Sequence, residues 1–449
     1  MLLGVDRAVA AEKPNIVLIF ADDLGWRDTG FTGSEYYETP NLDRLAGQGM
    51  VFTQAYSAMG NCAPSRACLL SGQYTPRHSV YAVGSTKRGD VELMRMLPVQ
   101  NKSGLPADEL TLGKAMKAAG YVTGMFGKWH LDGKTGSTPE DHFDVVKVAG
   151  HTWRDKQADP KGIYAITEAA CQFMEENRDR PFFAYIPHYA VHTPIQARPA
   201  TVAKFKEKSP GEIHKDPLYA GCIAELDNGV GMVMRKLAEL GLEKNTLVLF
   251  TSDNGGTATV QEPLRGKKGG YYEGGIREPM IVRWPAVVKP GTTCDVPVIN
   301  VDFYPTFLAA AGAKPPGDRP LDGESLLPLL EGKPLAREAI FWHFPGYLNG
   351  PVPRGRDPVF RTRPVSVIRK GDWKLHLYHE EWQLDGGREK LDTNRAVELY
   401  NLVDDAGERN DLARENTARR DELLGDLLTW IEKTPAPLPT EVNPQYKPK

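Results

Sequence analysis

Residues 15–21 read Asn-Ile-Val-Leu-Ile-Phe-Ala, a continuous apolar run rich in β-branched residues that leads directly into Asp22 and Asp23. A strand without polar residues on either face is typical of a parallel sheet that helices cover on both sides. In such sheets, ligands bind at the carboxyl ends of the strands. This stretch therefore predicts a central strand of a layered α/β fold, with a polar site where the strand ends.

Further strands and amphipathic helices alternate along the chain. We expect strands at residues 121–126, 182–187, 246–252 and 280–284, and helices at residues 39–46, 110–119, 164–176 and 219–240. This alternation predicts a large, mainly parallel sheet sandwiched by helices. Asp253, like Asp22, follows directly after a predicted strand.

The C-terminal part has a different character. Residues 343–364 are rich in Gly, Pro and Arg without a clear period, which indicates a long functional loop. A β-hairpin is expected over residues 365–378, and a closing helix over 421–432. A chain of this length exceeds one small core. We therefore expect a catalytic domain over residues 13–340 and a small α+β domain over residues 341–449 that contributes to the substrate pocket.

Composition excludes several classes of protein. The 449 residues carry 55 Lys and Arg against 58 Asp and Glu, a formal net charge of −3, which argues against a nucleic-acid binder. No stretch approaches the roughly 18 apolar residues that cross a bilayer. Residues 1–12 end near Ala8-Val9-Ala10, which resembles a signal-peptide cleavage region interrupted by charges. They are interpreted as a disordered leader or a signal-peptide remnant, the latter implying a periplasmic or secreted protein.

One cysteine lies in a motif that carries chemistry. The five cysteines are scattered and odd in number, so a disulfide framework is not expected. Residues 62–72 read Cys-Ala-Pro-Ser-Arg-Ala-Cys-Leu-Leu-Ser-Gly. This segment resembles the signature of the formylglycine-dependent sulfatases, in which a Cys followed by x-Pro-Ser-Arg is oxidised to formylglycine. The alternative, a structural cysteine at the start of a helix, does not explain the complete pattern.

The resemblance implies a fold and an activity. The expected fold is alkaline-phosphatase-like, and the expected reaction is hydrolysis of sulfate esters, after a maturation enzyme has converted Cys62. A thiol would form a stable adduct with the sulfuryl group, whereas a hydrated aldehyde has a second hydroxyl that can expel sulfate. Pro64 at the helix entry and the free N–H groups there would present position 62 to an anion.

A set of oxygen ligands follows two of the predicted strands. Asp22 and Asp23 end the first strand, and Asp253 and Asn254 end a later one. Three carboxylates and an amide suit Ca²⁺, with Mg²⁺ as the alternative. In the sulfatase family the matching positions bind one divalent ion that also contacts the residue at position 62. Asp253 is also the candidate base that deprotonates the attacking hydroxyl.

Basic groups of the family pattern recur in order along the chain. Gly127-Lys128-Trp129-His130 matches the family's Gly-Lys-Trp-His, and His192-Thr193-Pro194 matches its His-x-Pro. Residues 264–275 match a Leu-Arg-x-x-Lys-Gly…Glu-Gly-Gly pattern whose register selects Lys268 rather than Lys267. By this resemblance the charge on the sulfuryl oxygens is stabilised by Arg66, Lys128 and Lys268. His192 or Lys268 protonates the leaving alcohol, and His130 removes the remaining hydroxyl proton.

Residues that contact the rest of the substrate are less well defined by the pattern. His151 and His343 are candidates, with Trp153 and His188 as further possibilities. Arg354 and Arg356, with Arg361 and Arg363 nearby, would suit a polyanionic sugar because guanidinium groups bind sulfates and carboxylates at two points. A sulfated galactan or a glycosaminoglycan is the expected substrate class. The bland alternative is a solvated basic loop that pairs with nearby acids.

Two other functions remain open. A phosphate or phosphonate ester hydrolase can use the same scaffold, because fold alone does not define function. A non-catalytic binder of sulfated glycans would keep the basic residues but would not require Asp253 or His130. Turnover of an aryl sulfate compared with an aryl phosphate distinguishes all three.

The first prediction concerns the nucleophile. Active protein should carry formylglycine at position 62, detectable by mass spectrometry of the tryptic peptide. Cys62→Ala should abolish turnover because no nucleophile remains. Cys68→Ala should largely retain it, because Cys68 occupies a variable position of the motif. Unmodified cysteine in fully active protein would disprove the assignment.

Overall fold

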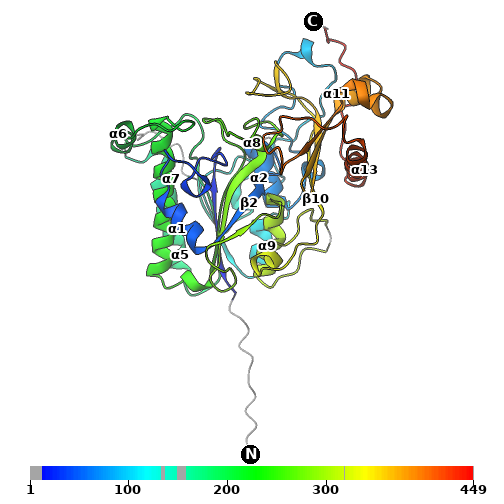
Figure 1. Ribbon diagram of the computed structural model, residues 1–449. Helices are drawn as coiled ribbons and strands as arrows, with labels where there is room; N and C mark the ends of the chain where they lie inside the picture. Colours follow the sequence, from blue (N-terminus) through cyan, green and yellow to red (C-terminus); the bar gives the residue numbers. More distant parts are fainter. Residues whose placement is uncertain (1–12, 133–136, 149–157, 318, 448–449) are drawn as a thin grey trace, which may run out of the picture.

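The computed structural model describes residues 13–132, 137–148, 158–317 and 319–447, and its centre is a nine-stranded mixed sheet (Figure 1). The strand order is β4-β3-β5-β1-β6-β7-β2-β8, and β9 also pairs with β2. Most pairs are parallel, while β7 runs antiparallel to both β6 and β2. The strands are β1 Asn15–Ala21, β2 Met50–Tyr56, β3 Val122–Phe126, β4 Val145–Lys147, β5 Phe182–Pro187, β6 Thr246–Ser252, β7 Arg277–Arg283, β8 Thr292–Cys294 and β9 Val298–Ile299.

Helices cover both faces of this sheet. On one face lie α1 (Pro40–Gln48), α5 (Ile163–Glu176) and α7 (Pro217–Glu239), and on the other lie α2 (Cys62–Ser71), α4 (Leu112–Ala118) and α9 (Phe303–Ala310) (Figure 1). The short helix α6 (Pro199–Glu207) packs on α7. The expected alkaline-phosphatase-like sandwich is therefore present.

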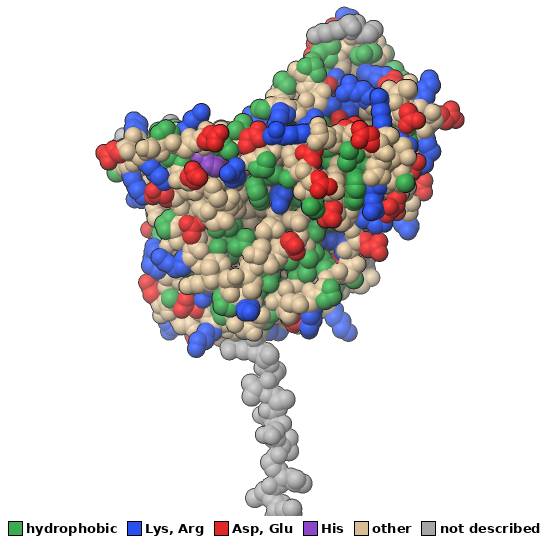
Figure 2. Space-filling view, viewed as in Figure 1, with side chains coloured by type: hydrophobic (Ala, Val, Ile, Leu, Met, Phe, Trp, Pro, Cys, Tyr) green, Lys and Arg blue, Asp and Glu red, His purple; other side chains and the backbone are tan. Residues whose placement is uncertain are grey.

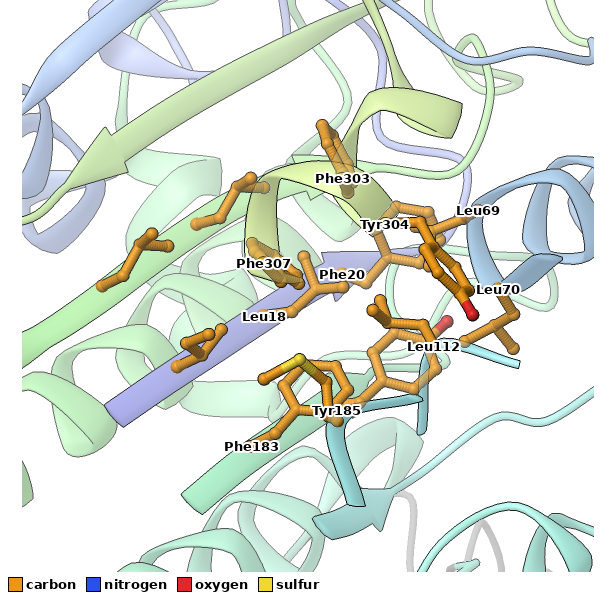
Figure 3. Packing of buried hydrophobic residues seen from close by; sticks show 14 of the residues in the cluster. Leu18, Phe20, Leu69, Leu70, Leu112, Phe183, Tyr185, Phe303, Tyr304 and Phe307 are labelled. Atoms are coloured by element: carbon orange, nitrogen blue, oxygen red, sulfur yellow. The ribbon is translucent and has the colours of Figure 1, made fainter. Parts of the chain in front are cut away.

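Strand β1 shows why the sequence folds this way. Ile16, Leu18 and Phe20 enter one hydrophobic core, and the alternate residues Val17 and Ile19 enter the other. Figure 3 shows Leu18 and Phe20 packed between the aromatic residues of β5 and α9 and the leucines of α2. An apolar residue at every position satisfies both faces of the sheet. This strand is thereby held rigidly at the centre, with its carboxyl end aimed at one edge of the fold.

A second sheet forms the C-terminal part. It is antiparallel, in the order β10 (Ala339–Phe344), β13 (Val365–Lys370), β14 (Trp373–Tyr378) and β15 (Val397–Asn401). Helix α13 (Thr417–Lys433) packs on it, and α11 (His379–Leu384) follows β14. The expected domain division, between residues 340 and 341, falls within β10. The whole of β10 belongs to the second sheet, which therefore begins at Ala339.

One expectation for this part was wrong. Residues 343–364 are not a loop throughout, because the end of β10 and a two-stranded ribbon, β11 (Leu348–Asn349) with β12 (Phe360–Thr362), lie within them. Strands of two and three residues are too short to show a period in the sequence. The hairpin β13–β14 and the closing helix α13 are where they were predicted.

Three further features complete the picture. Residues of the N-terminal half join the C-terminal part through bridges from Lys87 to Tyr347 and from Met96 to Val442. Among the described residues, no helix combines the length and apolarity needed to cross a bilayer. The expected leader, residues 1–12, lies outside the described residues.

Buried charges link the two sheets. Lys374 on β14 is fully buried, and its Nζ lies 2.9 Å from Oε1 of Glu273 and 2.9 Å from Oε1 of Glu408, both also buried. Glu273 begins the short helix α8 (Glu273–Ile276), which precedes β7 of the large sheet. An ion pair of this kind stabilises the fold only while it is complete.

We predict that Lys374→Met lowers the free energy of unfolding by about 3–5 kcal/mol, because two buried carboxylates lose their cation. The matched control is Lys370→Met on the same hairpin. Lys370 is partly exposed and lies 2.8 Å from Asp426, so its loss should cost no more than about 1 kcal/mol. Urea unfolding of both variants measures the difference. Equal losses would show that the buried network does not hold the two sheets together.

Candidate active site

The site lies where two neighbouring parallel strands end. Strands β1 and β6 pair in a register that sets Ala21 opposite Ser252. The next residues, Asp22 with Asp23 and Asp253 with Asn254, are therefore brought side by side. All four are at most 1% exposed.

Backbone bonds hold this turn in place. The N–H of Asp22 donates to the carbonyl of Ala190 (2.8 Å), and the N–H of Val191 donates back to the carbonyl of Asp22 (2.7 Å). Asp23 has a φ of 66°, a left-handed conformation that Asp tolerates better than most residues. Its N–H donates to Oδ1 of Asp253 (3.1 Å). The segment after β5 and the end of β6 thus fix both aspartates.

Cys62 lies directly against this cluster, at the first residue of α2. Its Sγ is 3.4 Å from Oδ1 of Asp22, and Nζ of Lys268 is 3.0 Å from Sγ. The side chain is 1% exposed. Burial, together with the carboxylates of Asp253, Asp22 and Asp23, raises the pKa of the thiol well above its ordinary value. An unmodified Cys62 would therefore be held as the neutral thiol.

Two lysines place their ammonium groups on the aspartates. Nζ of Lys128 donates to Oδ2 of Asp22 (2.6 Å), and Nζ of Lys268 donates to Oδ1 of Asp23 (2.5 Å). Burial alone would raise the pKa of Asp22, but Lys128, Arg66 and Lys268 hold it well below its usual range. Lys267, the neighbour that the sequence register excluded, forms no ion pair with any described residue of this site.

Arg66 pairs with an aspartate of the site, and its expected contact with a sulfuryl group stays a prediction. The guanidinium is fully buried, and its Nε and Nη2 both donate to Oδ2 of Asp253 (3.0 and 2.8 Å) while Nη1 donates to the carbonyl of Lys128 (3.1 Å). It therefore orients Asp253. Burial and the neighbouring Asp22 nevertheless raise the pKa of Asp253 to about 7.

The two histidines occupy different environments. Nε2 of His192 lies 3.7 Å from Oδ2 of Asp23, Nδ1 faces the carbonyl of Thr193 at 2.6 Å, and a third of the side chain remains exposed. His130 is largely buried, and its Nδ1 has no partner among the described residues. Burial and the nearby cations Lys128 and Arg66 lower the pKa of His130 to about 3, so it is neutral. His192 thus faces the entrance, and His130 the interior.

The residues present fit a hard divalent cation. Ligand atoms of Asp22, Asp23, Cys62 and His192 lie within 4.8 Å of one another. Two further buried oxygens, Oδ2 of Asp23 and Oδ1 of Asn254, have no hydrogen-bond partner in the described part of the chain. Buried acceptors without a donor are costly, and a bound cation would satisfy both. The cluster is therefore a candidate metal centre.

Among the described residues, His343 and His188, two candidates for substrate contact, form no hydrogen bond or ion pair with this cluster. His151 and Trp153 lie outside the described residues. His343 is buried in the second sheet, and both ring nitrogens have partners there, Nδ1 on Ser366 (2.8 Å) and Nε2 on the carbonyl of Pro437 (3.0 Å). His188 is also fully buried, and neither ring nitrogen has a partner among the described residues.

Arg356 and Arg354, for which a substrate contact stays a prediction, pair with nearby acids and carbonyls. Arg356 donates to Glu398 (2.8 Å) and Glu381 (2.8 Å) and stacks over the ring of Tyr378. Arg354 lies 3.3 Å from Glu262 and donates to the carbonyls of Pro263 and Leu264. The alternative of a basic segment paired with acids describes these two residues.

One arginine of the basic segment lies directly beside the site. Arg361 on β12 donates through Nη1 to the carbonyl of Lys268 (3.1 Å). In the sequence it is one of four arginines in a segment without a period, so composition was the only sign of a role for it in substrate binding. It lies in the β11–β12 ribbon, whose strands are too short to be predicted from the sequence.

A mixed sheet with carboxylates at the ends of adjacent parallel strands, facing a residue at a helix start, defines a hydrolase of the alkaline-phosphatase-like class. The sulfatase family model matches residues 14–313, and the model of the N-sulphoglucosamine sulphohydrolase C-terminal region matches residues 267–429. The chain belongs to the sulfatase family and is an enzyme that hydrolyses sulfate esters.

Individual relatives agree with this assignment. A sulfatase from Formosa agariphila is 33% identical over 95% of this chain and 90% of its own length. The N-acetylgalactosamine-6-sulfatase of Mus musculus is 32% identical over 84% of this chain and 74% of its own. A crystal structure of Ps i-CgsB in complex with k-i-k-neocarrahexaose superposes with a TM-score of 0.74 at 28% identity, covering 93% of each chain.

The paired state of Arg356 yields a prediction. Arg356→Ala should lower the midpoint of thermal unfolding by several degrees, because Glu381 and Glu398 lose a buried partner. Arg354→Ala is the control, since Arg354 is about a third exposed and should change the midpoint little. Differential scanning calorimetry measures both. A stable Arg356→Ala protein that instead loses affinity for substrate would restore the binding role.

Proposed function

We propose that this enzyme removes sulfate from a sulfated carbohydrate, with a formylglycine made from Cys62 and one Ca²⁺ held by Asp22, Asp23, Asp253 and Asn254. The observation that carries the proposal is the position of Cys62. Its Sγ lies within 3.6 Å of oxygens of Asp22 and Asp23 and of the ammonium of Lys268. A nucleophile at that point meets both the metal ligands and a cation for the sulfuryl group.

The chain's own residues divide the work. When bound, Ca²⁺ supplies positive charge at the sulfuryl oxygens, and the oxidised residue 62 supplies an oxygen nucleophile. Lys128 and Lys268 add positive charge on the same side, in a buried site where such charge acts strongly. Asp253, oriented by Arg66, takes the proton from the hydroxyl at position 62. His130 is neutral and is the proposed acceptor of the second proton, whose removal releases sulfate, although its lowered pKa makes it a weak base.

The leaving-group acid is His192 or Lys268. His192 is a third exposed, which suits a group that faces the departing alcohol, and its Nε2 is directed at Asp23. Lys268 is nearly buried, and although burial lowers its pKa, the neighbouring carboxylates of Asp23 and Asp22 raise it above the ordinary value. A lysine that holds its proton so firmly is a poor acid. These observations favour His192.

The substrate class rests on relatives and on charge. One relative is named an N-acetylgalactosamine-6-sulfatase, and one structural neighbour was solved with k-i-k-neocarrahexaose. Sulfated galactans and glycosaminoglycans therefore both remain proposals for this chain. A formylglycine-generating enzyme is the maturation partner that the proposal needs, and a periplasmic or secreted location is proposed with it.

The rivals remain a phosphate or phosphonate ester hydrolase and a non-catalytic glycan binder. The decisive experiment measures turnover of nitrophenyl sulfate, nitrophenyl phosphate and a sulfated sugar by protein coexpressed with the maturation enzyme. We expect kcat/KM for the sulfate to exceed that for the phosphate by at least about 100-fold, equivalent to about 2.7 kcal/mol. His192→Ala should lose much more activity on the sugar sulfate than on nitrophenyl sulfate, whose leaving group needs little protonation.

Other outcomes contradict parts of this proposal. A preference for phosphate would favour the first rival, and binding without turnover would favour the second. Equal losses on both sulfates in the His192→Ala protein would transfer the acid role to Lys268.

The metal prediction is separate from activity. Purified enzyme should hold one Ca²⁺ per chain by elemental analysis, and chelation should lower the midpoint of thermal unfolding, because an ion bound only by the native state stabilises it. Asp23→Asn should lower both occupancy and rate. Asp372→Asn, in the exposed turn of the β13–β14 hairpin, is the control. Two metals per chain, or tetrahedral coordination typical of zinc, would contradict the assignment.

A further inference from the structure

Three cations form a group beside the candidate active site. They are Arg361 on β12, Lys267 in the segment before α8, and Arg88 in the segment that joins the C-terminal part. Nη1 of Arg361 donates to the carbonyl of Lys268 (3.1 Å), whose own Nζ lies 3.0 Å from Sγ of Cys62. Lys268 therefore lies between the guanidinium of Arg361 and Cys62.

Packing defines the position of Arg361. Nε donates to the carbonyl of Gly350 (3.2 Å) across the ribbon, and a Cβ added at Gly269 would lie 2.4 Å from Cδ of Arg361. Gly269 has a φ of 86°, so a side chain there would also strain the backbone. Arg361 is thus confined between the ribbon and the Lys268–Gly269 segment, rather than free to move like a surface arginine.

Arg88 is brought to the same place by its neighbour. A Cβ added at Gly89 would lie 2.8 Å from the ring of Phe360, the residue before Arg361. The N–H of Arg88 donates to the carbonyl of Tyr347, just before β11 (3.2 Å). Residues 88 and 89 therefore lie against the β11–β12 ribbon, and the Arg88 side chain is exposed beside it.

No acid neutralises this group among the residues that the structure describes. Arg361, Lys267 and Arg88 form no ion pair there, whereas Arg354, Arg356 and Arg363 in the same region all do. Burial and the charge of Arg88 lower the pKa of Arg361, and burial and Arg361 lower that of Lys267. Arg361 is thus repelled by Arg88 and repels Lys267, and an anion bound between them would reduce this repulsion.

We propose that Arg361, with Arg88 and Lys267, binds a second anionic group of the substrate, a sulfate or a carboxylate, close to the sulfate ester that is hydrolysed. Nη2 of Arg361 has no acceptor among the described residues, so the outer edge of the guanidinium is available to such a group. The inference rests on the proposed function and deepens it. The enzyme then prefers polyanionic sugars over sugars that carry a single sulfate.

The group also has a position that fits this role. Arg361 bonds the carbonyl of Lys268 (3.1 Å), and Nζ of Lys268 bonds Oδ1 of Asp23 (2.5 Å), so one residue separates Arg361 from a candidate metal ligand. Lys and Arg side chains, interspersed with acids, gather on the C-terminal part in the view of Figure 2. Because acids neutralise Arg354, Arg356 and Arg363, the positive charge that remains beside the site belongs to Arg361, Arg88 and Lys267.

The experiment compares kcat/KM of maturated enzyme on three matched substrates. They are a monosulfated sugar, the same sugar with a second sulfate, and the same sugar linked to a uronic acid. We expect Arg361→Ala to lower kcat/KM on at least one dianionic substrate at least about tenfold more than on the monosulfated one. Arg88→Ala removes an exposed side chain and keeps the backbone bond to Tyr347. It should lower kcat/KM on the same dianionic substrate about threefold or more relative to the monosulfated one. The arm that responds identifies sulfate or carboxylate as the partner.

Controls separate this inference from the proposed function. Lys87→Ala removes an exposed neighbouring cation and should leave the ratio between the substrates unchanged. Thermal unfolding checks that the variants are folded. If the parent hydrolyses the sulfates but Arg361→Ala and Arg88→Ala change all substrates alike, the second anionic site is refuted while the sulfatase activity stands. If the parent hydrolyses no sulfate, the proposed function fails, and the inference fails with it.

Discussion

Three carboxylates and three cations are buried together where strands β1 and β6 end, and the rest of the site is arranged around their pairing. Asp22 pairs with Lys128, Asp23 with Lys268 and Asp253 with Arg66. A buried charge without a partner costs several kcal/mol, so each aspartate requires its cation to be delivered by another part of the chain. The requirement joins five parts of the chain: residues 22–23, the α2 helix, the segment after β3, Asp253 at the end of β6, and the segment before α8.

This constraint explains why the C-terminal part is attached where it is. Lys268 lies in a long connection between β6 and β7, and that connection ends at Glu273, which Lys374 of the second sheet neutralises. Arg361 of the ribbon bonds the carbonyl of Lys268 from the same side. The second sheet therefore does not stand apart from the chemistry. It holds in place the segment that brings Lys268 to the candidate site.

Much of this arrangement was predictable, because it depends on local patterns with strong physical causes. A continuous apolar run such as residues 15–21 is stable only as a strand that is buried on both faces of a sheet. The order of strands and helices then brings Asp22 and Asp253 to one edge of that sheet. The motif around Cys62 and the ordered recurrence of Lys128, His192 and Lys268 carried the site by resemblance. The buried role of Arg66 was not predictable, because a motif specifies which residue is present but not which neighbour takes its donors.

The arginines of the C-terminal part show where sequence reasoning reached its limit. Arg354, Arg356, Arg361 and Arg363 look equivalent as letters in a segment without periodicity. Their roles differ because of partners that come from remote elements: Glu398 on β15 and Glu381 on α11 neutralise Arg356, and Glu380 neutralises Arg363. Only Arg361 meets carbonyls and another cation instead of an acid. Whether an arginine stabilises a fold or recognises an anion is thus decided by what the fold places opposite it. Which acid lies opposite each arginine depends on long-range contacts, which composition does not encode. For this reason we propose substrate binding for Arg361, which has no acidic partner among the described residues, and a structural role for the paired arginines.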